Sequence, residues 1–404
     1  MGFTGVGISK TNSFGGAIST PDSVGILVIG GAVAASGLAL KTAKALLSPK
    51  DAESVGIDPS YDDTNNILAY HHIDEFFRIA PDGKLYIVLD DGSLTDATLK
   101  TILKQNQDIS FGGVVRNSAT APADFGVFIG KYQNIINDLS AEGRLISSFL
   151  VEGKEFDPAT AIADYPDLRS NAMPNISVVI AQDPVIRALK SQYETYGAIG
   201  TALGSIAVRK VNENIGSVNI EVKPKAYRGT LDYPLTDKGR QRWMGALLQS
   251  GKNVEELNAN EIKALNDKGY LFVGSYNGYA GYYWNNSHTA VTKTSDYAHI
   301  ENNRVWNKAA LIIRKALLPK VKSNIDKDPA TGYINETTAK ELEAFAEKKL
   351  GQMVADKEAS GVGVYIDPKQ ALRDDVPLVV KVQVVHNDII HKFNVQLGLT
   401  DKIS

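Results

Sequence analysis

The end of the chain constrains the fold most, because it has the pattern of two β-strands where a chain normally frays. Residues 378–399 are rich in Val and Ile, and their apolar and polar residues alternate, as in half-buried strands. The apolar phase of the second strand comprises Phe393, Val395, Leu397 and Leu399. Terminal segments are usually polar and poorly ordered. The final strand therefore needs a partner edge, either in its own sheet or in a neighbouring molecule.

The start of the chain has a similar character. Residues 1–18 are punctuated by Gly and contain the apolar side chains of Phe3, Val6 and Ile8. Such a segment is prone to extended structure but has little apolar surface of its own. We therefore expect a β arm at each end of the chain, over 1–18 and 379–404.

Composition excludes several classes of function. The chain has 404 residues, no cysteine and a formal net charge of −3. Without cysteine it has no disulfide, no Cys-ligated zinc, no iron–sulfur cluster and no thiol nucleophile. A near-neutral charge gives no sign of nucleic-acid binding, which needs a clustered basic excess. The apolar stretch 24–33 contains several glycines, and we expect it to be a buried strand, with no membrane span and no membrane partner.

The first half of the chain alternates between strand and helix patterns. Strands are predicted at 24–29, 84–89, 109–115, 145–151 and 176–180, and helices at 65–79 and 125–139. Another helix is predicted after Ser93 and Asp96, which form a capping-box pattern. This alternation is typical of an α/β layer domain. The fold class predicted for the whole chain is α/β (α+β), with mixed sheets flanked by helices and extended N- and C-terminal β arms.

Residues 196–211 have the pattern of a buried helix. Gly197, Gly200 and Gly204 lie among Ala, Ile and Leu. In a chain without membrane spans, this spacing favours a packed core helix whose small residues let another helix approach closely.

The later part of the chain contains an aromatic segment and two long helices. The aromatic segment, 276–284, is expected to be a loop or hairpin. The helices are predicted at 304–321 and 338–357, and Thr338 with Glu341 forms a capping-box pattern at the start of the second.

No linear motif of an active site is present. The adjacent residues His71 and His72 point about 100° apart on a helix, so they do not form a metal-binding pair. Gly274-Ser275-Tyr276-Asn277-Gly278 has its serine one place early for a nucleophile elbow and opens no helix. We therefore predict no catalytic, cofactor-binding or metal-binding residue, no cofactor and no enzymatic activity.

A basic stretch lies in the first of the two long helices. Between Glu301 and Lys322 the sequence contains six basic residues against Glu301 alone, a local charge of +5: Arg304, Lys308, Arg314, Lys315, Lys320 and Lys322. A basic stretch is usually a solvated face. The alternative is a docking surface for an acidic partner in a protein assembly.

The order of features in the last third resembles the contractile tail sheath proteins of phages and phage-derived contractile injection systems. The resemblance covers about 270–404, with a weaker part at 1–50. It depends on the aromatic-Gly stretch and the following Ser287-His-Thr-Ala-Val turn, the helix Arg304-Val-Trp-Asn-Lys-Ala-Ala-Leu-Ile-Ile-Arg, and the turn Gly332-Tyr-Ile-Asn-Glu-Thr-Thr. The strand Gly361-Val-Gly-Val-Tyr-Ile-Asp, the Val-rich final pair and the Gly-punctuated N-terminal arm complete it.

This resemblance implies a structural subunit that assembles helically around an inner tube by exchange of β-strands between subunits. Contraction of the assembly would drive the tube through a target envelope. The implied partners are further copies of the chain, the inner tail tube protein, and baseplate and tail terminator proteins. The implied location is a virion tail or injection particle assembled in the bacterial cytoplasm.

The same resemblance divides the chain into four parts: the N-terminal arm 1–18, an α/β outer domain 19–230, a tube-proximal core domain 231–378 and the C-terminal arm 379–404. It implies that Arg304, Lys308, Arg314 and Lys315 face the tube. Two alternatives stay open: a cytosolic α/β enzyme or ligand-binding protein without a recognisable motif, and another tail component of the tube or baseplate.

Overall fold

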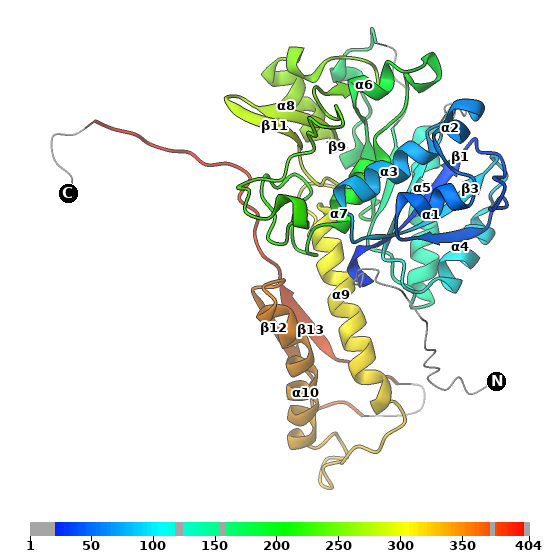
Figure 1. Cartoon of the computed structure of the whole chain (residues 1–404). Coiled ribbons are helices and arrows are strands. Elements are labelled where there is room, and N and C mark those ends of the chain that lie inside the picture. The colour runs from blue at the N-terminus through cyan, green and yellow to red at the C-terminus, as the bar shows by residue number, and fades with distance from the viewer. Residues whose placement is uncertain (1–20, 118–123, 154–157, 372–375, 400–404) are drawn as a thin grey trace. The chain divides into compact units, whose positions relative to one another are not determined.

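A computed structural model describes residues 21–117, 124–153, 158–371 and 376–399. The chain forms two compact units, whose boundary falls between Asn307 and Lys308, within helix α9 (Figure 1). The α-helices are α1 (Pro49–Ser54), α2 (Pro59–Asn65), α3 (Ala69–Ile79), α4 (Asp96–Gln105), α5 (Phe125–Ala141), α6 (Pro184–Arg187), α7 (Ile199–Ala207), α8 (Ala259–Lys268), α9 (Ile300–Leu317) and α10 (Glu336–Ala355). The strands are β1 (Val24–Gly30), β2 (Ala43–Leu46), β3 (Lys84–Asp90), β4 (Phe111–Val115), β5 (Phe149–Glu152), β6 (Ile176–Val179), β7 (Ala181–Gln182), β8 (Leu247–Leu248), β9 (Tyr270–Leu271), β10 (Val273–Tyr276), β11 (Tyr279–Trp284), β12 (Gly361–Tyr365) and β13 (Lys381–Val385).

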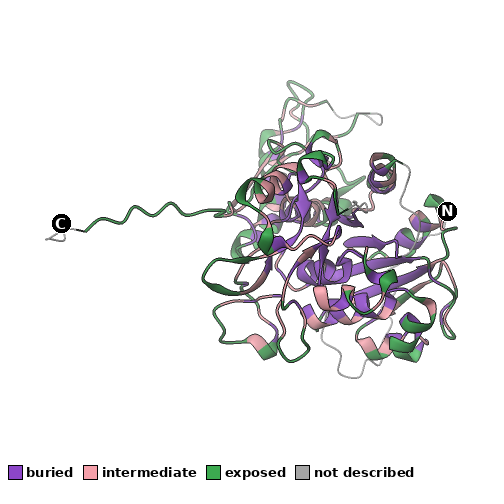
Figure 2. Ribbon diagram, turned by 90° about the horizontal axis from the view of Figure 1, so that it is seen from above, coloured by how far each residue is buried: buried purple, intermediate pink, exposed green. Residues whose placement is uncertain are grey.

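The first unit is built on a seven-stranded sheet in the order β2-β3-β1-β4-β5-β6-β9. Strand β2 runs antiparallel to β3, and the other neighbours are parallel. All seven residues of β1 are buried, as expected of a strand covered on both faces. Figure 2 shows the same burial across the centre of the sheet. The structure confirms the predicted α/β class and its mixed sheet flanked by helices.

Alternation along β4 shows which helices cover each face of this sheet. A Cβ atom built on Gly113 would lie 2.9 Å from Ile199, which belongs to α7. On the opposite face, a Cβ atom on Gly112 would meet the ring of Phe149, and that ring stacks on Tyr132 of α5 with 4.8 Å between centroids. Helix α7 therefore covers one face and α5 the other.

Two glycines let α3 lie directly against α7. A Cβ atom at Gly200 would be 2.2 Å from the carbonyl oxygen of His72, and one at Gly204 would be 2.8 Å from that of Phe76. All nine residues of α7 are buried. The close helix approach predicted from these small residues is thus confirmed.

The aromatic segment of the first unit is a hairpin, which is one of the two structures expected from the sequence, a loop or a hairpin. Strands β10 and β11 pair antiparallel, with Val273 opposite Trp284 and an irregularity between Ser275 and Tyr276. Trp284 is buried, whereas Tyr276 is half exposed. The hairpin thus anchors one end in the core and exposes the other.

The second unit has a small core of its own beneath a two-stranded sheet. Strands β12 and β13 are antiparallel, with Gly361 opposite Val385 and Tyr365 opposite Lys381. Its buried apolar side chains include Ile334, Ala339 and Ile366, and those packed against them are Ile325, Leu342, Leu378 and Val380. The Glu343 carboxylate of α10 accepts a hydrogen bond from the Ile366 backbone N–H at 2.8 Å, which ties this helix to the end of β12.

The chain beyond β13 adopts no helix or strand over residues 386–399, and this segment runs extended in Figure 1. The strand predicted at 392–399 is thus absent from the single chain, because among the described residues no strand edge pairs with it. The N-terminal arm 1–18, with Phe3, Val6 and Ile8, lies outside the described residues.

Candidate functional site

The two-stranded sheet of the second unit has both outer edges open. No other strand of the described chain pairs with β12 or β13, so each strand keeps one edge of unpaired main-chain donors and acceptors. Alternate residues of β13 are exposed and half-buried, as in a sheet covered on one face. A sheet covered on one face and open at both edges can accept one additional strand on each side.

The segment 386–399 has the matching properties of a donor strand. The exposed fractions of Phe393, Val395, Leu397 and Leu399 are 76%, 78%, 91% and 104%. These four side chains alternate with polar ones, so an extended backbone puts all four on one face. The sequence predicted them as the residues of an inter-subunit arm, and the structure leaves them exposed on one extended segment.

Arg304 is placed differently from the other predicted tube-facing residues. Its side chain is buried, with 3% exposed. The guanidinium donates hydrogen bonds to the carbonyl oxygens of Lys210 at 3.0 Å and of Asp22 and Arg209 at 3.1 Å. These carbonyls lie just before β1 and just after α7, and the Lys210 carbonyl oxygen also accepts the Glu213 N–H at 3.1 Å. Arg304 therefore joins three segments of the first unit, and in the single chain it does not belong to an exposed basic face.

The other three predicted tube-facing residues lie in the second unit. Lys308 forms an ion pair with Glu358, with 2.6 Å between Nζ and Oε1, and the Glu358 side chain is 8% exposed. Arg314 and Lys315 are exposed. Of the predicted set, these two side chains present charge to solvent, while Lys308 also stabilises the fold.

The adjacent histidines His71 and His72 lie in a buried group of polar side chains around Glu75. Glu75 accepts two hydrogen bonds from the Arg78 guanidinium at 2.7 Å each and one from Trp243 Nε1 at 3.3 Å. Burial alone would raise the pKa of Glu75, but the nearby Arg78 and Arg242 together outweigh burial, and the pKa is lowered to about 2. Burial lowers the pKa of His71 to about 4 and that of His72 well below its ordinary value. Both imidazoles are therefore neutral at neutral pH.

One serine, one histidine and one glutamate do meet in space. The Ser287 hydroxyl donates to Glu301 Oε2 at 2.5 Å and lies 3.3 Å from Nδ1 of His299. The amide of Asn214 donates to both Ser287 and Glu301, and burial raises the pKa of Glu301. Ser287 is fully buried, and none of the three residues lines either cavity described below. Their geometry therefore joins the 286–290 turn to the start of α9 and gives no access to a substrate.

The crevice that holds ligands in many α/β sheets is filled by this chain's own side chains. In such sheets the ligand lies outside the carboxyl ends of the strands where the strand order reverses, here at β1 and β4. The Asn117 amide donates to the Gly30 carbonyl oxygen at 2.8 Å and accepts from the Leu68 N–H at 2.9 Å. The Arg116 N–H donates to Glu152 Oε2 at 2.6 Å. Among the residues that the structure describes, this position supports the fold and shows no nucleotide cradle.

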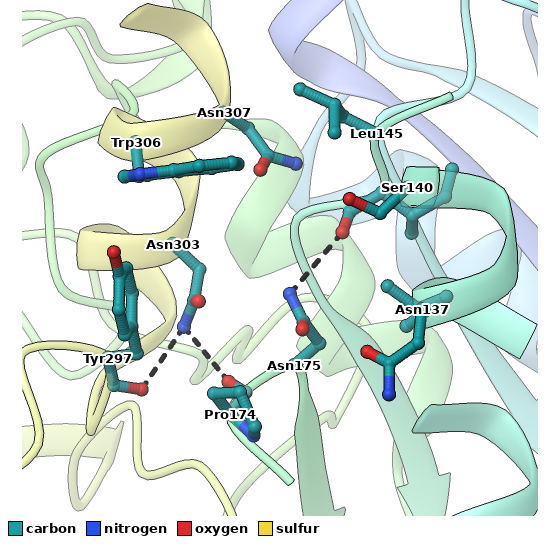
Figure 3. A pocket seen from close by; sticks show the side chains of 11 residues that line it. Asn137, Ser140, Leu145, Pro174, Asn175, Tyr297, Asn303, Trp306 and Asn307 are labelled. Carbon is teal, nitrogen blue, oxygen red and sulfur yellow. Dashed lines mark hydrogen bonds between the residues drawn. The ribbon is translucent and has the colours of Figure 1, made fainter. Parts of the chain in front are cut away.

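Two cavities lie in the first unit. One, of about 440 Å³, lies between the β10–β11 hairpin and α8 and has Phe272 and Trp284 among its lining residues. The other, of about 170 Å³, lies between α5 and the start of α9 and has Trp306 in its wall (Figure 3). Within the described ranges, no group of three or more His, Asp or Glu residues could hold a metal ion, and no helix is long and apolar enough to cross a membrane.

Comparison with known protein families assigns the chain to one of them. The family described as DUF2586 matches with its N-terminal domain over residues 3–288 and with its C-terminal domain over residues 296–404. The chain therefore belongs to the DUF2586 family. No curated protein matches it in sequence.

Solved structures show the same fold at low sequence identity. A chain in the baseplate of the anti-feeding prophage is 13% identical, with a TM-score of 0.62 and 99% of each chain covered. A chain of the contracted sheath complex of an extracellular contractile injection system is 12% identical, with a TM-score of 0.60 and coverages of 99% and 98%. The sheath tail protein from Desulfitobacterium hafniense is 11% identical, with a TM-score of 0.52, and the match covers 95% of this chain and 100% of that one. The fold of this chain is thus one that sheath and baseplate structures of contractile machines contain.

Proposed function

We propose that the chain is a structural subunit of a contractile tail sheath, held to its neighbours by exchange of β-strands. The observation that carries the proposal is the open-edged β12–β13 sheet in the same unit as an exposed, unpaired segment with a strand pattern at 392–399. The likeness of the whole chain to sheath structures supports it.

The energetics explain why the arm is unpaired in a single chain. Burying Phe393, Val395, Leu397 and Leu399 contributes roughly 1.5–3 kcal/mol each, or 6–12 kcal/mol together. Ordering eight backbone residues costs roughly 1–2 kcal/mol each, or 8–16 kcal/mol. The two terms are of similar size, so the arm becomes a strand only where an acceptor edge adds main-chain hydrogen bonds. The outer edges of β12 and β13 on a neighbouring chain supply such bonds.

An exchanged arm also fixes the symmetry of the assembly. The donor segment and the acceptor sheet are different surfaces, so an arm that is passed on to the next subunit, and not exchanged reciprocally within a dimer, makes a heterologous contact and generates either a ring or an open helix. An open helix around an inner tube is a sheath. In contraction, subunits would rotate and slide to a lower-energy packing while the arms keep them connected, without nucleotide hydrolysis by this chain.

The proposed partners are further copies of the chain, an inner tail tube, and baseplate and terminator proteins, in a virion tail or injection particle assembled in the bacterial cytoplasm. The division into 1–18, 19–230, 231–378 and 379–404 is proposed as a division by place in the assembly. It is distinct from the packing units that meet at Asn307 and Lys308.

A matched pair of arm variants tests the proposal. One variant replaces Phe393, Val395 and Leu397 with Ser, which removes the apolar face. The control replaces the alternating neighbours Lys392, Asn394 and Gln396 with Ser, which leaves that face intact. Negative-stain microscopy and sedimentation velocity measure assembly, and circular dichroism checks the fold.

We expect the apolar-face variant to stay folded and to lose assembly, while the control assembles like the wild type. Assembly of the apolar-face variant at the wild-type level would refute strand exchange through this arm. A baseplate component is the second candidate, because one matching structure is a baseplate. Closed rings of fixed size that never extend into tubes would favour it over a sheath.

A further inference from the structure

The smaller cavity has a fixed shape, because hydrogen bonds hold both of its sides. Asn303 of α9 donates from its amide to the Pro174 carbonyl oxygen at 2.9 Å and to that of Tyr297 at 3.2 Å. The Asn175 side chain donates to the Ser147 carbonyl oxygen at 2.9 Å, and the Asn175 backbone N–H donates to Gln133 Oε1 of α5 at 3.0 Å. These bonds tie the Pro174–Asn175 segment to α5 and to α9, so the two sides of the cavity are held at one separation.

The floor of the cavity is apolar and one wall is aromatic. Ile136 and Ile146 are buried beneath it. Trp306 is 46% exposed and meets Tyr297 edge to face, with ring centroids 6.5 Å apart. Figure 3 shows the indole of Trp306 on one side of the cavity and the α5 side chains across from it.

Three further lining side chains are neutral and polar. Asn137 and Ser140 come from α5 and Asn307 from α9 (Figure 3). The Asn137 carbonyl oxygen accepts from Gln133 Nε2 at 2.8 Å, which orients this amide so that its NH₂ group is left for a ligand. No residue that lines this cavity carries a charge.

We propose that this cavity binds the pyranose ring of a neutral sugar. Its volume of about 170 Å³ equals the liquid volume of roughly six water molecules, which limits the occupant to one ring-sized group. The C–H face of the ring lies against the indole of Trp306. The sugar hydroxyl groups accept from the Asn137 NH₂ group, and they donate to and accept from the Asn307 amide and the Ser140 hydroxyl.

Other ligand classes fit the lining less well. A charged ligand would lose hydration without any compensating charge in the wall. A purely apolar group would displace water from the rim amides without replacing the hydrogen bonds of that water. A second copy of the chain, inserting a side chain beside Trp306, is the competing occupant. The amide donors and acceptors on both sides of the cavity favour a polyhydroxylated ring over a single side chain. They also favour such a ring over a flat apolar surface of a partner protein.

Tryptophan fluorescence gives a direct readout. The chain has three tryptophans. Trp243 and Trp284 are each 1% exposed, whereas Trp306 is 46% exposed. Acrylamide therefore quenches mainly Trp306, and a bound ring protects it. The probes are glucose, galactose, mannose and N-acetylglucosamine, each as the free sugar and as the methyl glycoside, which stands for the end of a glycan.

We expect saturable protection by at least one probe, with a dissociation constant on the order of 1 mM, as suits a ligand with few atoms in a shallow site. Asn137→Ala and Asn307→Ala each remove one neutral hydrogen-bonding partner and should weaken binding by roughly 3- to 10-fold. Asn134→Ala is the matched control, because Asn134 is exposed on the same helix and does not line the cavity. Its binding should equal that of the wild type.

The outcome is independent of the sheath proposal when the titration is run at a protein concentration where sedimentation shows monomer. Absence of protection by every probe at tenfold above the expected constant would overturn the sugar site. Protection that appears on assembly without sugar would assign the cavity to a second copy instead. A preference for methyl glycosides over free sugars would identify the end of a glycan as the source.

Discussion

The contact between α3 and α7 makes a sharp prediction, because one methyl group at Gly200 has no space. An Ala Cβ there would lie 2.2 Å from the His72 carbonyl oxygen, whereas close C–H···O contacts are about 3.3–3.6 Å. The helices must therefore separate by about 1 Å. Unlike a flexible side chain, the backbone of α3 cannot rotate away from the clash.

The magnitude follows from three terms. Overpacking a dense core costs roughly 1–3 kcal/mol, and a backbone clash belongs at the upper end. Separation also weakens the bond from the Gly200 N–H to Nδ1 of His72, 3.2 Å long, which is worth about 1 kcal/mol. Ala gains about 1 kcal/mol over Gly in helix propensity. We therefore expect Gly200→Ala to lower the free energy of unfolding by about 3 kcal/mol.

Two further glycines provide the comparison. At Gly204 the nearest atom is the Phe76 carbonyl oxygen at 2.8 Å, so Gly204→Ala should destabilise less than Gly200→Ala. At Gly130, within α5, the nearest atom is the terminal methyl of Met173 at 3.1 Å. That methyl can move, so Gly130→Ala should be neutral or stabilise by up to about 1 kcal/mol.

Urea unfolding, followed by far-UV circular dichroism, measures all three variants. The result that would refute the reasoning is a Gly200→Ala protein as stable as Gly130→Ala. Equal losses at Gly200 and Gly204 would show that the helices adjust more freely than the distances imply.

Three other predictions follow from buried and exposed charges. Arg304→Met should lower the free energy of unfolding by about 3 kcal/mol, because three charge-assisted hydrogen bonds to backbone carbonyl oxygens are lost; an unchanged urea midpoint would contradict this role. Because burial lowers the pKa of His71 to about 4, the unfolded state binds its proton first, and stability should fall from about pH 6.5 to 4 by about 3 kcal/mol. Asp62 has an effect of opposite sign, because burial raises its pKa to about 7. The difference between the pH dependence of unfolding of the wild type and that of His71→Phe isolates the contribution of His71. If both proteins lose stability in parallel as the pH falls, His71 does not make this contribution. If the inner tube of the proposed sheath is the acidic partner of this basic stretch, reversal of Arg314 and Lys315 to Glu should slow assembly on it and weaken the salt dependence; unchanged kinetics would show that these charges only face solvent.

The periodic core elements could be predicted from sequence because their pattern is set by burial. Strands β1, β3 and β4 lie within two residues of their predicted bounds. Helix ends were less predictable, because several polar residues compete for each cap. The cap of α4 is Thr95, which accepts from the Thr98 N–H, and neither Ser93 nor Asp96 takes that place. Helix α10 begins after Asn335, which accepts from the Thr337 N–H, so the box predicted from Thr338 and Glu341 was wrong.

Tertiary contacts were the part that sequence could not give. Arg304 has the spacing of its basic neighbours, but its partners are the carbonyl groups of Asp22, Arg209 and Lys210. No local pattern links such distant segments. The cavity beside Trp306 is likewise built from α5, the Pro174–Asn175 segment and α9, so its amides had no shared signal in the sequence.

The composition of the open-edged sheet has a consequence for the timing of polymerisation. Strand β12 contains Gly361 and Gly363, and β13 begins with Lys381. Glycines weaken a strand, and lysine at an edge discourages casual pairing. Under the proposed function, a lone pair of subunits would form a poor nucleus, and growth would need a template that raises the local concentration of arms and edges. Newly made protein would then remain a soluble reserve until a finished tube offers a place to polymerise.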